Sequence, residues 1–144
     1  MEPTTEIKDI MSKDIITAEP NDTLAKVRDK ISNHLIHHMP VVEDGKVIGM
    51  ISVNDLHRME HPFTAFKNPE SEDSNRQIFA SMLAKEIMSS PVVKVKETEP
   101  VSHAVDILLE NLFHSLPVVN KDDKLVGIIT TFDLIKHSLE PKIK

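Results

Sequence analysis

Hydrophobic and polar residues follow one another along this chain in a pattern that occurs twice. In the second copy, apolar residues recur at intervals of three and four, as in a helix with one face on a core: Val101, Ala104, Val105, Leu108, Leu109 and Leu112. The first copy has a thinner stripe at the equivalent positions: Leu24, Val27, Ile31 and Leu35. Arg28 and Ser32 stand where the second copy has Val105 and Leu109. We therefore predict that the first helix is less deeply buried than the second.

Short apolar runs on either side of each helix predict three strands per copy. The Asp44-Gly45 pair between two of these runs is a strong hairpin signal, and a longer loop takes its place in the second copy. Each copy therefore reads β-α-β-β-α after a short helical segment. The predicted strands are 15–17, 40–42 and 47–51, then 92–95, 118–119 and 125–129, and the final helices run from 53 to about 59 and from 131 to about 138.

The duplication is also visible in individual motifs. Three segments return at matched spacing: 8–12 at 85–89, 37–42 at 114–119, and 49–56 at 127–134. We therefore predict two repeats, 7–59 and 84–138, joined by a linker at 60–83. Within the linker, residues 76–83 are compatible with a short helix, and the preceding stretch of proline, asparagine and charged residues predicts a loop: Pro62, Asn68 and 69–75.

Composition narrows the classes of function. Among 144 residues, 17 are basic and 23 acidic, and the formal net charge of −6 argues against non-specific binding to nucleic acid. The absence of cysteine excludes disulfides and thiol catalysis. No apolar run approaches the roughly 20 residues of a membrane span, and the first residues do not have the pattern of a signal peptide. We expect a cytoplasmic protein that binds neither a nucleic-acid polymer nor a membrane.

The ordered set of repeated motifs resembles the tandem CBS-domain family, named after cystathionine β-synthase. The matching motifs are Ile-Met-Ser, His-x-x-Pro-Val-Val and Gly-x-x-Ser/Thr-x-x-Asp-Leu, each present in both repeats. The resemblance implies an α+β fold in which two β-α-β-β-α repeats pack sheet to sheet with pseudo-two-fold symmetry, as one Bateman-type module. It also implies binding of adenosine compounds in clefts between the repeats, and pairing into a homodimer. Exposed apolar residues expected on the flanking helices would form the dimer interface.

The end of the last strand in each repeat carries the first candidate site. Ser52 and Thr130 each precede a helix, where a hydroxyl caps free backbone amides and the helix start favours phosphate. Asp55 and Asp133 follow three residues later, and a carboxylate suits a ribose diol because it only accepts hydrogen bonds. The resemblance implies that the hydroxyls contact phosphate and the carboxylates hold ribose. The same pattern is also a helix capping box that binds nothing.

Histidines before the Pro-Val-Val strands form a second candidate group. The resemblance implies that His37, His38 and His114 lie where basic residues of the family reach phosphates. Arginine, which grips phosphate more firmly than histidine, is missing from the second of these positions in both repeats. These histidines are alternatively ordinary surface or interface residues. A metal site that combines His34 with His37 and His38 is a further alternative, although we predict no bound metal.

The resemblance also implies an apolar adenine slot in each cleft. The slot residues are Ile16, Thr17, Met39 and Pro40 in one cleft, and Val93, Lys94, Leu116 and Pro117 in the other. Core packing is the alternative for each of these side chains. Thr17 is equivalent to Lys94, and Asn54 is equivalent to Phe132, so we expect unequal affinities at the two clefts.

Together these observations predict a regulatory module that senses adenine nucleotides or related adenosyl compounds. AMP, ADP and ATP lead the candidate ligands, S-adenosylmethionine is another, and no cofactor is obligatory. No nucleophile elbow, Walker loop or zinc-protease motif is present, so we predict that the chain is not an enzyme. We expect a homodimer that signals to an effector protein. Two alternatives stay open, a structural dimerisation module without nucleotide and a histidine-based metal or pH sensor.

Overall fold

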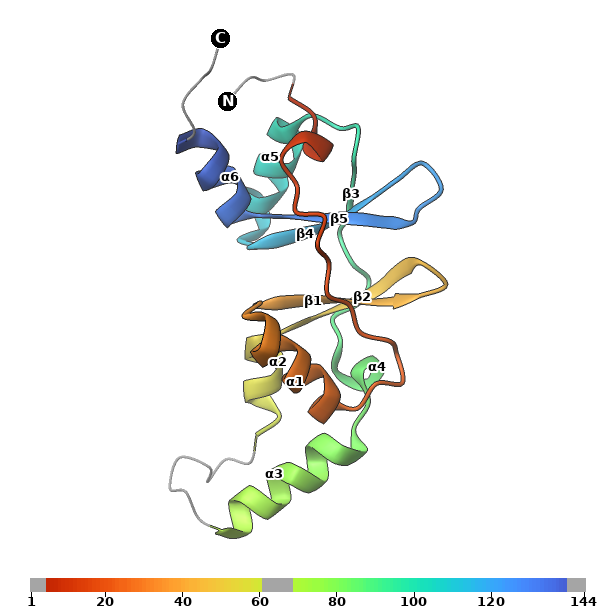
Figure 1. Cartoon of the computed structure of the whole chain (residues 1–144), viewed down its shortest axis with the longest axis vertical. Coiled ribbons are helices and arrows are strands. Elements are labelled where there is room, and N and C mark those ends of the chain that lie inside the picture. The colour runs from red at the N-terminus through yellow and green to blue at the C-terminus, as the bar shows by residue number, and fades with distance from the viewer. Residues whose placement is uncertain (1–4, 61–68, 140–144) are drawn as a thin grey trace. The chain divides into compact units, whose positions relative to one another are not determined.

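The structure, a computed structural model that describes residues 5–60 and 69–139, divides into two compact units. Ile16–Val92 form one of them, which we call the continuous unit. Met1–Ile15 and Val93–Lys144 form the other, which we call the split unit because two distant parts of the chain build it. Each unit contains one small sheet and several helices, so the fold class is α+β, as the sequence predicts (Figure 1).

The continuous unit is built around an antiparallel hairpin. Strand β1 pairs with β2, with His38 opposite Ser52, and one irregularity between Val41 and Val42 interrupts the register. The two turn residues, Asp44 and Gly45, both have positive φ angles, of 53° and 80°, which is typical of the predicted tight hairpin turn. The elements of this unit are α1 (Leu24–His34), β1 (His38–Glu43), β2 (Lys46–Ser52), α2 (Val53–Arg58), α3 (Pro69–Ser81) and α4 (Ala84–Ile87).

The split unit repeats this plan with one strand more. Its hairpin places Ser115 opposite Thr130, with an irregularity between Val118 and Val119 that matches the one in the continuous unit. A short strand adds to the hairpin in parallel, with Val95 opposite Val118. The elements are the 3-10 helix η1 (Ile7–Asp9), β3 (Val95–Lys96), α5 (Val101–Asn111), β4 (Ser115–Val119), β5 (Leu125–Thr130) and α6 (Thr131–Leu139).

The first strand of each repeat is shorter than predicted. In the split unit the paired strand is Val95–Lys96, so only Val95 of the predicted run 92–95 is paired. In the continuous unit the predicted strand at 15–17 is not formed, and a single parallel bridge joins Ala18 to Val41 instead. The amide of Ala18 donates to the carbonyl of Pro40 at 2.9 Å, so the chain does reach the sheet, one residue later than the apolar run indicates.

The short segment that leads each sequence repeat belongs to the unit that contains the rest of the other repeat. Ser12, from the start of the first repeat, makes an antiparallel bridge to Ile128 of β5 in the split unit. Ser89, from the start of the second repeat, makes the equivalent bridge to Met50 of β2 in the continuous unit. The spatial units therefore differ from the predicted sequence repeats, whose boundaries stay a prediction.

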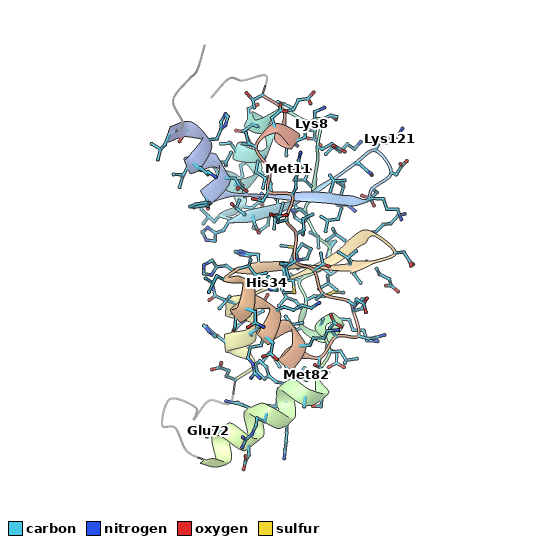
Figure 2. The ribbon with its side chains drawn as sticks, viewed as in Figure 1. Lys8, Met11, His34, Glu72, Met82 and Lys121 are labelled. Carbon is cyan, nitrogen blue, oxygen red and sulfur yellow. The ribbon has the colours of Figure 1, made fainter. Side chains whose placement is uncertain are left out.

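A methionine fixes each exchanged segment against a glycine of the neighbouring strand. A Cβ placed on Gly49 would lie 2.6 Å from Cγ of Met88, and one placed on Gly127 would lie 2.9 Å from Cγ of Met11. Figure 2 labels Met11 where its segment runs beside the β4–β5 hairpin. Any side chain at these two positions would force the methionine away, so the repeated glycines serve this contact.

Helix α3 corrects the prediction for the linker. Residues 69–75, which we predict to be loop, form the first half of a helix that continues to Ser81. The reason lies in the helix start, where proline is tolerated at the first position and acidic residues such as Glu72 and Asp73 favour the positive end of the helix dipole. The other loop residues of the prediction, Pro62 and Asn68, lie outside the described part of the chain.

Helix α3 packs on α1 through its C-terminal half (Figure 1). The Phe79 side chain is fully buried in the core of the continuous unit, and the guanidinium of Arg28 lies 4.9 Å from the centre of its ring. The chain then turns back, so that the carbonyl of Met82 accepts from the amide of Leu24 at 3.0 Å. Arg28, which interrupts the apolar stripe of α1 in the sequence, thus covers an aromatic ring.

The prediction that α1 is less buried than α5 is wrong. Each helix buries three apolar side chains of its stripe: Leu24, Val27 and Ile31 in α1, and Val101, Ala104 and Leu108 in α5. The additional leucines of α5 do not enter the core, since Leu109 is 70% exposed and Leu112 is 82% exposed. Most large exposed apolar side chains lie in the split unit, as predicted for flanking helices: Leu109, Leu112, Phe113, Phe132, Ile135 and Leu139.

Candidate functional site

In the continuous unit, the predicted site residues meet where β2 ends and α2 begins. Ser52 caps α2, its Oγ accepting from the amide of Asp55 at 3.1 Å. The carboxylate of Asp55 accepts in return from the amide of Ser52 at 2.7 Å, which completes a capping box. Its second oxygen forms an ion pair with Arg58, one turn later on the helix. The Asp55 side chain is almost buried, so its remaining surface is small.

In the split unit, the equivalent junction joins β5 to α6. Oδ2 of Asp133 accepts from the amide of Thr130 at 2.9 Å and from its hydroxyl at 3.0 Å. Oδ1 of Asp133 accepts from the hydroxyl of Ser12 at 2.8 Å, across 121 positions of the sequence. The exchanged N-terminal segment thereby supplies a hydrogen-bond donor to the site.

The Ser/Thr and Asp side chains thus cap the helix at both junctions. This capping does not occupy every acceptor direction of either carboxylate. A carboxylate has about four acceptor directions. Within residues 5–60 and 69–139, three bonds to Asp133 leave one of these directions, and two bonds to Asp55 leave two. Both groups therefore retain capacity to accept from a ligand hydroxyl.

Main-chain bonds bring the predicted histidines to the same junctions. The carbonyl of His37 accepts from the amide of Val53 at 3.0 Å, and the carbonyl of His114 accepts from the amide of Thr131 at 3.0 Å. His38 lies opposite Ser52 in the hairpin. The structure therefore places all three histidines within a residue or two of the strand-to-helix junction of their own unit.

The first-strand residues have different surroundings in the two units. The ammonium group of Lys30 donates to the carbonyl of Thr17 at 2.8 Å and lies 3.4 Å from the carboxylate of Asp22. Lys94, which is equivalent to Thr17, instead pairs with Asp123 in the β4–β5 loop at 2.8 Å. Ile16 is half-buried against the core of the continuous unit, whereas Val93 is exposed.

Asp22 is a buried charge that holds this part of the continuous unit together. Burial acts to raise the pKa of Asp22, but the backbone amide of Glu19 and the ammonium groups of Lys26 and Lys30 outweigh it and hold the pKa below its usual value. The amide of Glu19 donates to the carboxylate at 2.8 Å. A charged Asp22 therefore stabilises the turn that leads into α1.

Core packing accounts for the remaining adenine-slot residues. The Met39 side chain is fully buried in the core of the continuous unit, and Leu116 has the same place in the split unit. Pro40 and Pro117, next along the two strands, are buried as well. The side chains of Met39 and Leu116 thus belong to the hydrophobic cores, and the part of all four residues in ligand binding stays a prediction.

The junctions also differ in the residue after the helix start. Asn54 and Phe132 are both exposed, the phenylalanine by 70%. One junction thus presents an amide and the other an aromatic ring, which keeps the two sites chemically distinct.

Two residues of the site were not predicted from the sequence, Ser12 and Arg58. Arg58 was accessible to such reasoning, because an acidic and a basic residue three positions apart on a helix meet on its surface. The contact of Ser12 with Asp133 follows from the exchange of segments and has no local signal in the sequence.

The described residues offer no metal centre. Within 5–60 and 69–139, no three histidine, cysteine or acidic side chains are grouped so that they could hold a metal ion. The ring Nδ1 of His34 lies 2.9 Å from the carbonyl of Lys30, a hydrogen bond within α1. In the same part of the chain, no helix is long and apolar enough to cross a membrane.

Comparison with known families agrees with the repeated motifs. The family model described as CBS domain matches residues 7–61 and again residues 84–140. The chain belongs to the CBS-domain family. The resemblance drawn from the sequence is therefore confirmed, and the two matches make this chain a tandem CBS pair.

Individual relatives cover this CBS pair almost completely. The CBS domain-containing protein MJ0729 of Methanocaldococcus jannaschii is 29% identical over 131 residues, which are 91% of this chain and 93% of the relative. Other relatives are longer, since the aligned part is 46% of MJ1225 from the same organism and 61% of MK0525 from Methanopyrus kandleri.

Solved structures show the same fold. The structure of MJ1225 has a TM-score of 0.81 at 27% identity and covers 96% of this chain and 49% of its own. The CBS domain pair of protein MJ0100, solved in complex with 5′-methylthioadenosine and S-adenosyl-L-methionine, has a TM-score of 0.72 at 28% identity, with 94% and 97% coverage.

Proposed function

We propose that this CBS pair is a regulatory module that binds an adenosyl compound at the strand-to-helix junctions of its two units. AMP, ADP, ATP and S-adenosylmethionine are the candidate ligands. The observation that carries the proposal is the repeated carboxylate, Asp55 in one unit and Asp133 in the other, each beside a hydroxyl at the end of a strand. The ligands of the related MJ0100 pair, both adenosyl compounds, support this class.

The chemistry of the ribose explains the choice of class. A vicinal diol presents two hydrogen-bond donors, and a carboxylate fixed by the backbone is a suitable acceptor for them. Asp133 is held on one side by Thr130 and on the other by Ser12, so it is oriented before any ligand arrives. An oriented group loses little conformational freedom on binding.

The two junctions are proposed to bind with unequal affinity. Arg58 compensates the charge of Asp55, whereas the contacts of Asp133 are with neutral groups. Asp133 is also the more exposed of the two carboxylates. We therefore assign the tighter site to the split unit.

A binding experiment on paired variants tests the proposal. Thermal shift and calorimetry with AMP, ADP, ATP, S-adenosylmethionine and 5′-methylthioadenosine identify the ligand. Asp133→Asn keeps an oxygen that can accept from the amide of Thr130 but removes the charge, and we expect it to weaken binding at the tighter site at least about tenfold. Asp55→Asn should affect only the weaker site.

Asp106→Asn is the matched control, because this exposed aspartate on α5 lies outside both junctions. Its affinities should equal those of the unmodified chain. If both junction variants also bind as the unmodified chain does, the ribose role is wrong. The absence of any shift with millimolar ligand would favour the alternative of a structural module without nucleotide.

The remaining parts of the proposal concern the setting of the module. We propose that it acts without catalysis, in the cytoplasm, as a homodimer that passes ligand occupancy to an effector protein. Such signalling requires that the ligand bind two states of the protein with different affinity.

A further inference from the structure

The chain enters the sheet of the continuous unit through a single residue. The amide of Ala18 donates to the carbonyl of Pro40 at 2.9 Å, and the carbonyl of Ala18 accepts from the amide of Val42 at 2.8 Å. These two bonds form the one bridge between this stretch and β1 in the described part of the unit. We call residues 16–18 the entry segment. Thr17, its middle residue, lies just outside the sheet, so strand pairing does not hold it.

A side chain of α1 holds the main chain of Thr17 instead. The ammonium group of Lys30 donates to the carbonyl of Thr17 at 2.8 Å, and the Lys30 side chain is only 29% exposed. A hydrogen bond from a charged donor is stronger than one between neutral groups, and it gains further strength where water is largely excluded. Lys30 thus does for Thr17 what a neighbouring strand does for a residue within a sheet.

Asp22 keeps this ammonium group in place. A lysine side chain is a flexible stem, so its charged end needs a fixed partner to stay in one position. The Asp22 carboxylate is such a partner: it lies 3.4 Å from the ammonium of Lys30, it is 6% exposed, and the amide of Glu19 donates to it at 2.8 Å. Lys26 pairs with the other carboxylate oxygen at 3.2 Å, but this lysine is 58% exposed.

The split unit holds its equivalent segment, residues 93–95, in a different way. Ile107 stands at the position of Lys30, where it is partly buried against the core and has no group that donates a hydrogen bond. Lys94 stands at the position of Thr17, and its ammonium group pairs with Asp123. The next residue, Val95, pairs as a strand with Val118. A paired strand therefore supports this segment, whereas a lysine of α1 supports the entry segment.

Stabilisation of Asp22 alone does not explain the reach of Lys30. Lys26 and the amide of Glu19 already compensate the buried carboxylate, yet Lys30 also bonds a main-chain carbonyl on the entry segment. Ile16 and Thr17 are the residues of this segment that belong to the adenine slot of the proposed function. A segment that is fixed before a ligand arrives loses less conformational freedom on binding.

We infer that Lys30 is a positioning residue of the continuous unit: its ammonium group fixes the carbonyl of Thr17, and with it the entry segment, in the conformation that receives an adenosyl ligand. This role depends on the proposed function and adds a residue that serves the same site through the main chain. Lys30 makes no contact with the ligand in this role and does not affect the site of the split unit.

The first test uses an uncharged ligand, so that the loss of a positive charge does not by itself weaken binding. The probe is 5′-methylthioadenosine, and calorimetry measures its affinity at both sites. Lys30→Met keeps an unbranched side chain but removes the donor. We expect it to weaken the site that Asp55→Asn also weakens by about tenfold, and to leave the other site unchanged. Lys30→Arg retains a charged donor and should keep most of the affinity.

Lys26→Met is the matched control, because it also removes a cation from Asp22 and Lys26 forms its ion pair away from the entry segment. Its affinities should equal those of the unmodified chain. Equal losses from Lys26→Met and Lys30→Met would assign the effect to the charge balance of Asp22. Equal losses from Lys30→Met and Lys30→Arg would assign it to the packing of the stem. A loss of affinity for AMP alone would mean that Lys30 attracts phosphate. Each of these three results overturns the inference.

Hydrogen exchange in the absence of ligand tests the positioning itself. Lys30→Met should speed exchange of the Ala18 amide at least about tenfold, because the residue before it is released. The amide of Val27, which donates to the carbonyl of Thr23 within the first turns of α1, should keep its rate and so show that the unit stays folded. Unchanged exchange at Ala18 overturns the inference.

Failure of the proposed function is distinguishable from failure of this role. If the unmodified chain binds none of the adenosyl compounds, the ligand proposal and the role of Lys30 are both wrong. If the unmodified chain binds 5′-methylthioadenosine at two sites and Lys30→Met binds it equally well, only the role of Lys30 is wrong.

Discussion

The two units share one plan of sheet and helices but differ in how their helices are covered. In the continuous unit, α3 lies on α1 and buries Phe79, and the exposed residues of α1 and α2 are polar, whereas Leu35, which caps the end of α1, is 88% exposed. In the split unit, α5 and α6 present leucine, isoleucine and phenylalanine to solvent. The difference teaches that duplication preserved the antiparallel hairpin, the strand-to-helix junction and the glycine–methionine contact, while the outer faces diverged. The inner parts carry the proposed ligand chemistry, and the outer faces carry the proposed association.

We expect the largest difference in stability between the units when a phenylalanine is removed from each. Phe79→Ala empties a fully buried site that only the continuous unit has, and we expect a loss of about 3 to 5 kcal/mol in the free energy of unfolding. Phe132→Ala, at an exposed position of the split unit, should cost less than about 1 kcal/mol when the protein is dilute enough to be monomeric. Urea denaturation followed by circular dichroism measures both. If Phe79→Ala lowers the free energy of unfolding no more than Phe132→Ala does, the Phe79 ring of α3 adds no more to stability than an exposed ring.

A methionine packs on a glycine in both units, and the contact is tighter at Gly49 than at Gly127. Gly49→Ala and Gly127→Ala each force a methionine from its place, and we expect each to cost about 1 to 3 kcal/mol. Added to the second variant, Met11→Ala removes the three side-chain atoms nearest a Cβ at position 127, whereas Met88→Ala, added to the first, removes Cγ but leaves its own Cβ 2.8 Å from a Cβ at position 49, so the relief there is partial. Each double variant should therefore show less loss than the sum of its two single changes. If the loss in the free energy of unfolding of a double variant equals the sum of the two single losses, the methionine contact is not the reason that glycine is needed.

Removal of the charge of Asp22 should cost more stability than removal of the charge of its counterpart Glu99. We expect this difference to be smaller than those above and to depend on pH. Asp22→Asn should lower the free energy of unfolding by about 1 to 3 kcal/mol at neutral pH, because the carboxylate is buried among its partners. Since the fold holds the pKa of Asp22 below its unfolded value, this stabilisation is present above about pH 4 and is lost as the pH falls through the folded pKa.

Glu99→Gln is the comparison for this experiment. Glu99 bonds the amide of Lys96 at 2.9 Å in the same way, but it is less buried, and the loss should be smaller. Stability curves from pH 7 to pH 3 give both values. The difference in the free energy of unfolding between the unmodified protein and Asp22→Asn should shrink towards low pH. A difference that grows instead would contradict a lowered pKa of Asp22.

The sequence predicted those parts of the fold that depend on neighbouring residues. The Asp44-Gly45 turn, the final helices α2 and α6 and the pairing of serine or threonine with aspartate three positions later are all found. Their signals are short because each arises from backbone geometry within a few residues. Family resemblance then supplied the proposed roles of these residues.

The parts that the sequence did not reveal depend on contacts between distant residues. The bond from Ser12 to Asp133 exists only because the segment that leads the first repeat belongs to the same unit as the second repeat. Of the leucines in the stripe on α5, only Leu108 is buried in the core, and Leu109 and Leu112 are exposed. Periodicity alone does not distinguish a face that packs on the core from a second apolar face that is exposed. The first half of α3 was obscured by proline and acidic residues, which are typical of loops as well as of helix starts.

The exchange of leading segments sets an order of events during synthesis. All residues of the continuous unit have been made once Val92 has left the ribosome, so this unit can close while the rest of the chain is still being translated. Residues 5–15 are made before the continuous unit, yet their partners are made after it: residues 5–8 bond to residues 97–101, and Ser12 bonds to Ile128 of β5 and Asp133 of α6. The segment 5–15 must therefore stay without these partners until the continuous unit has been made.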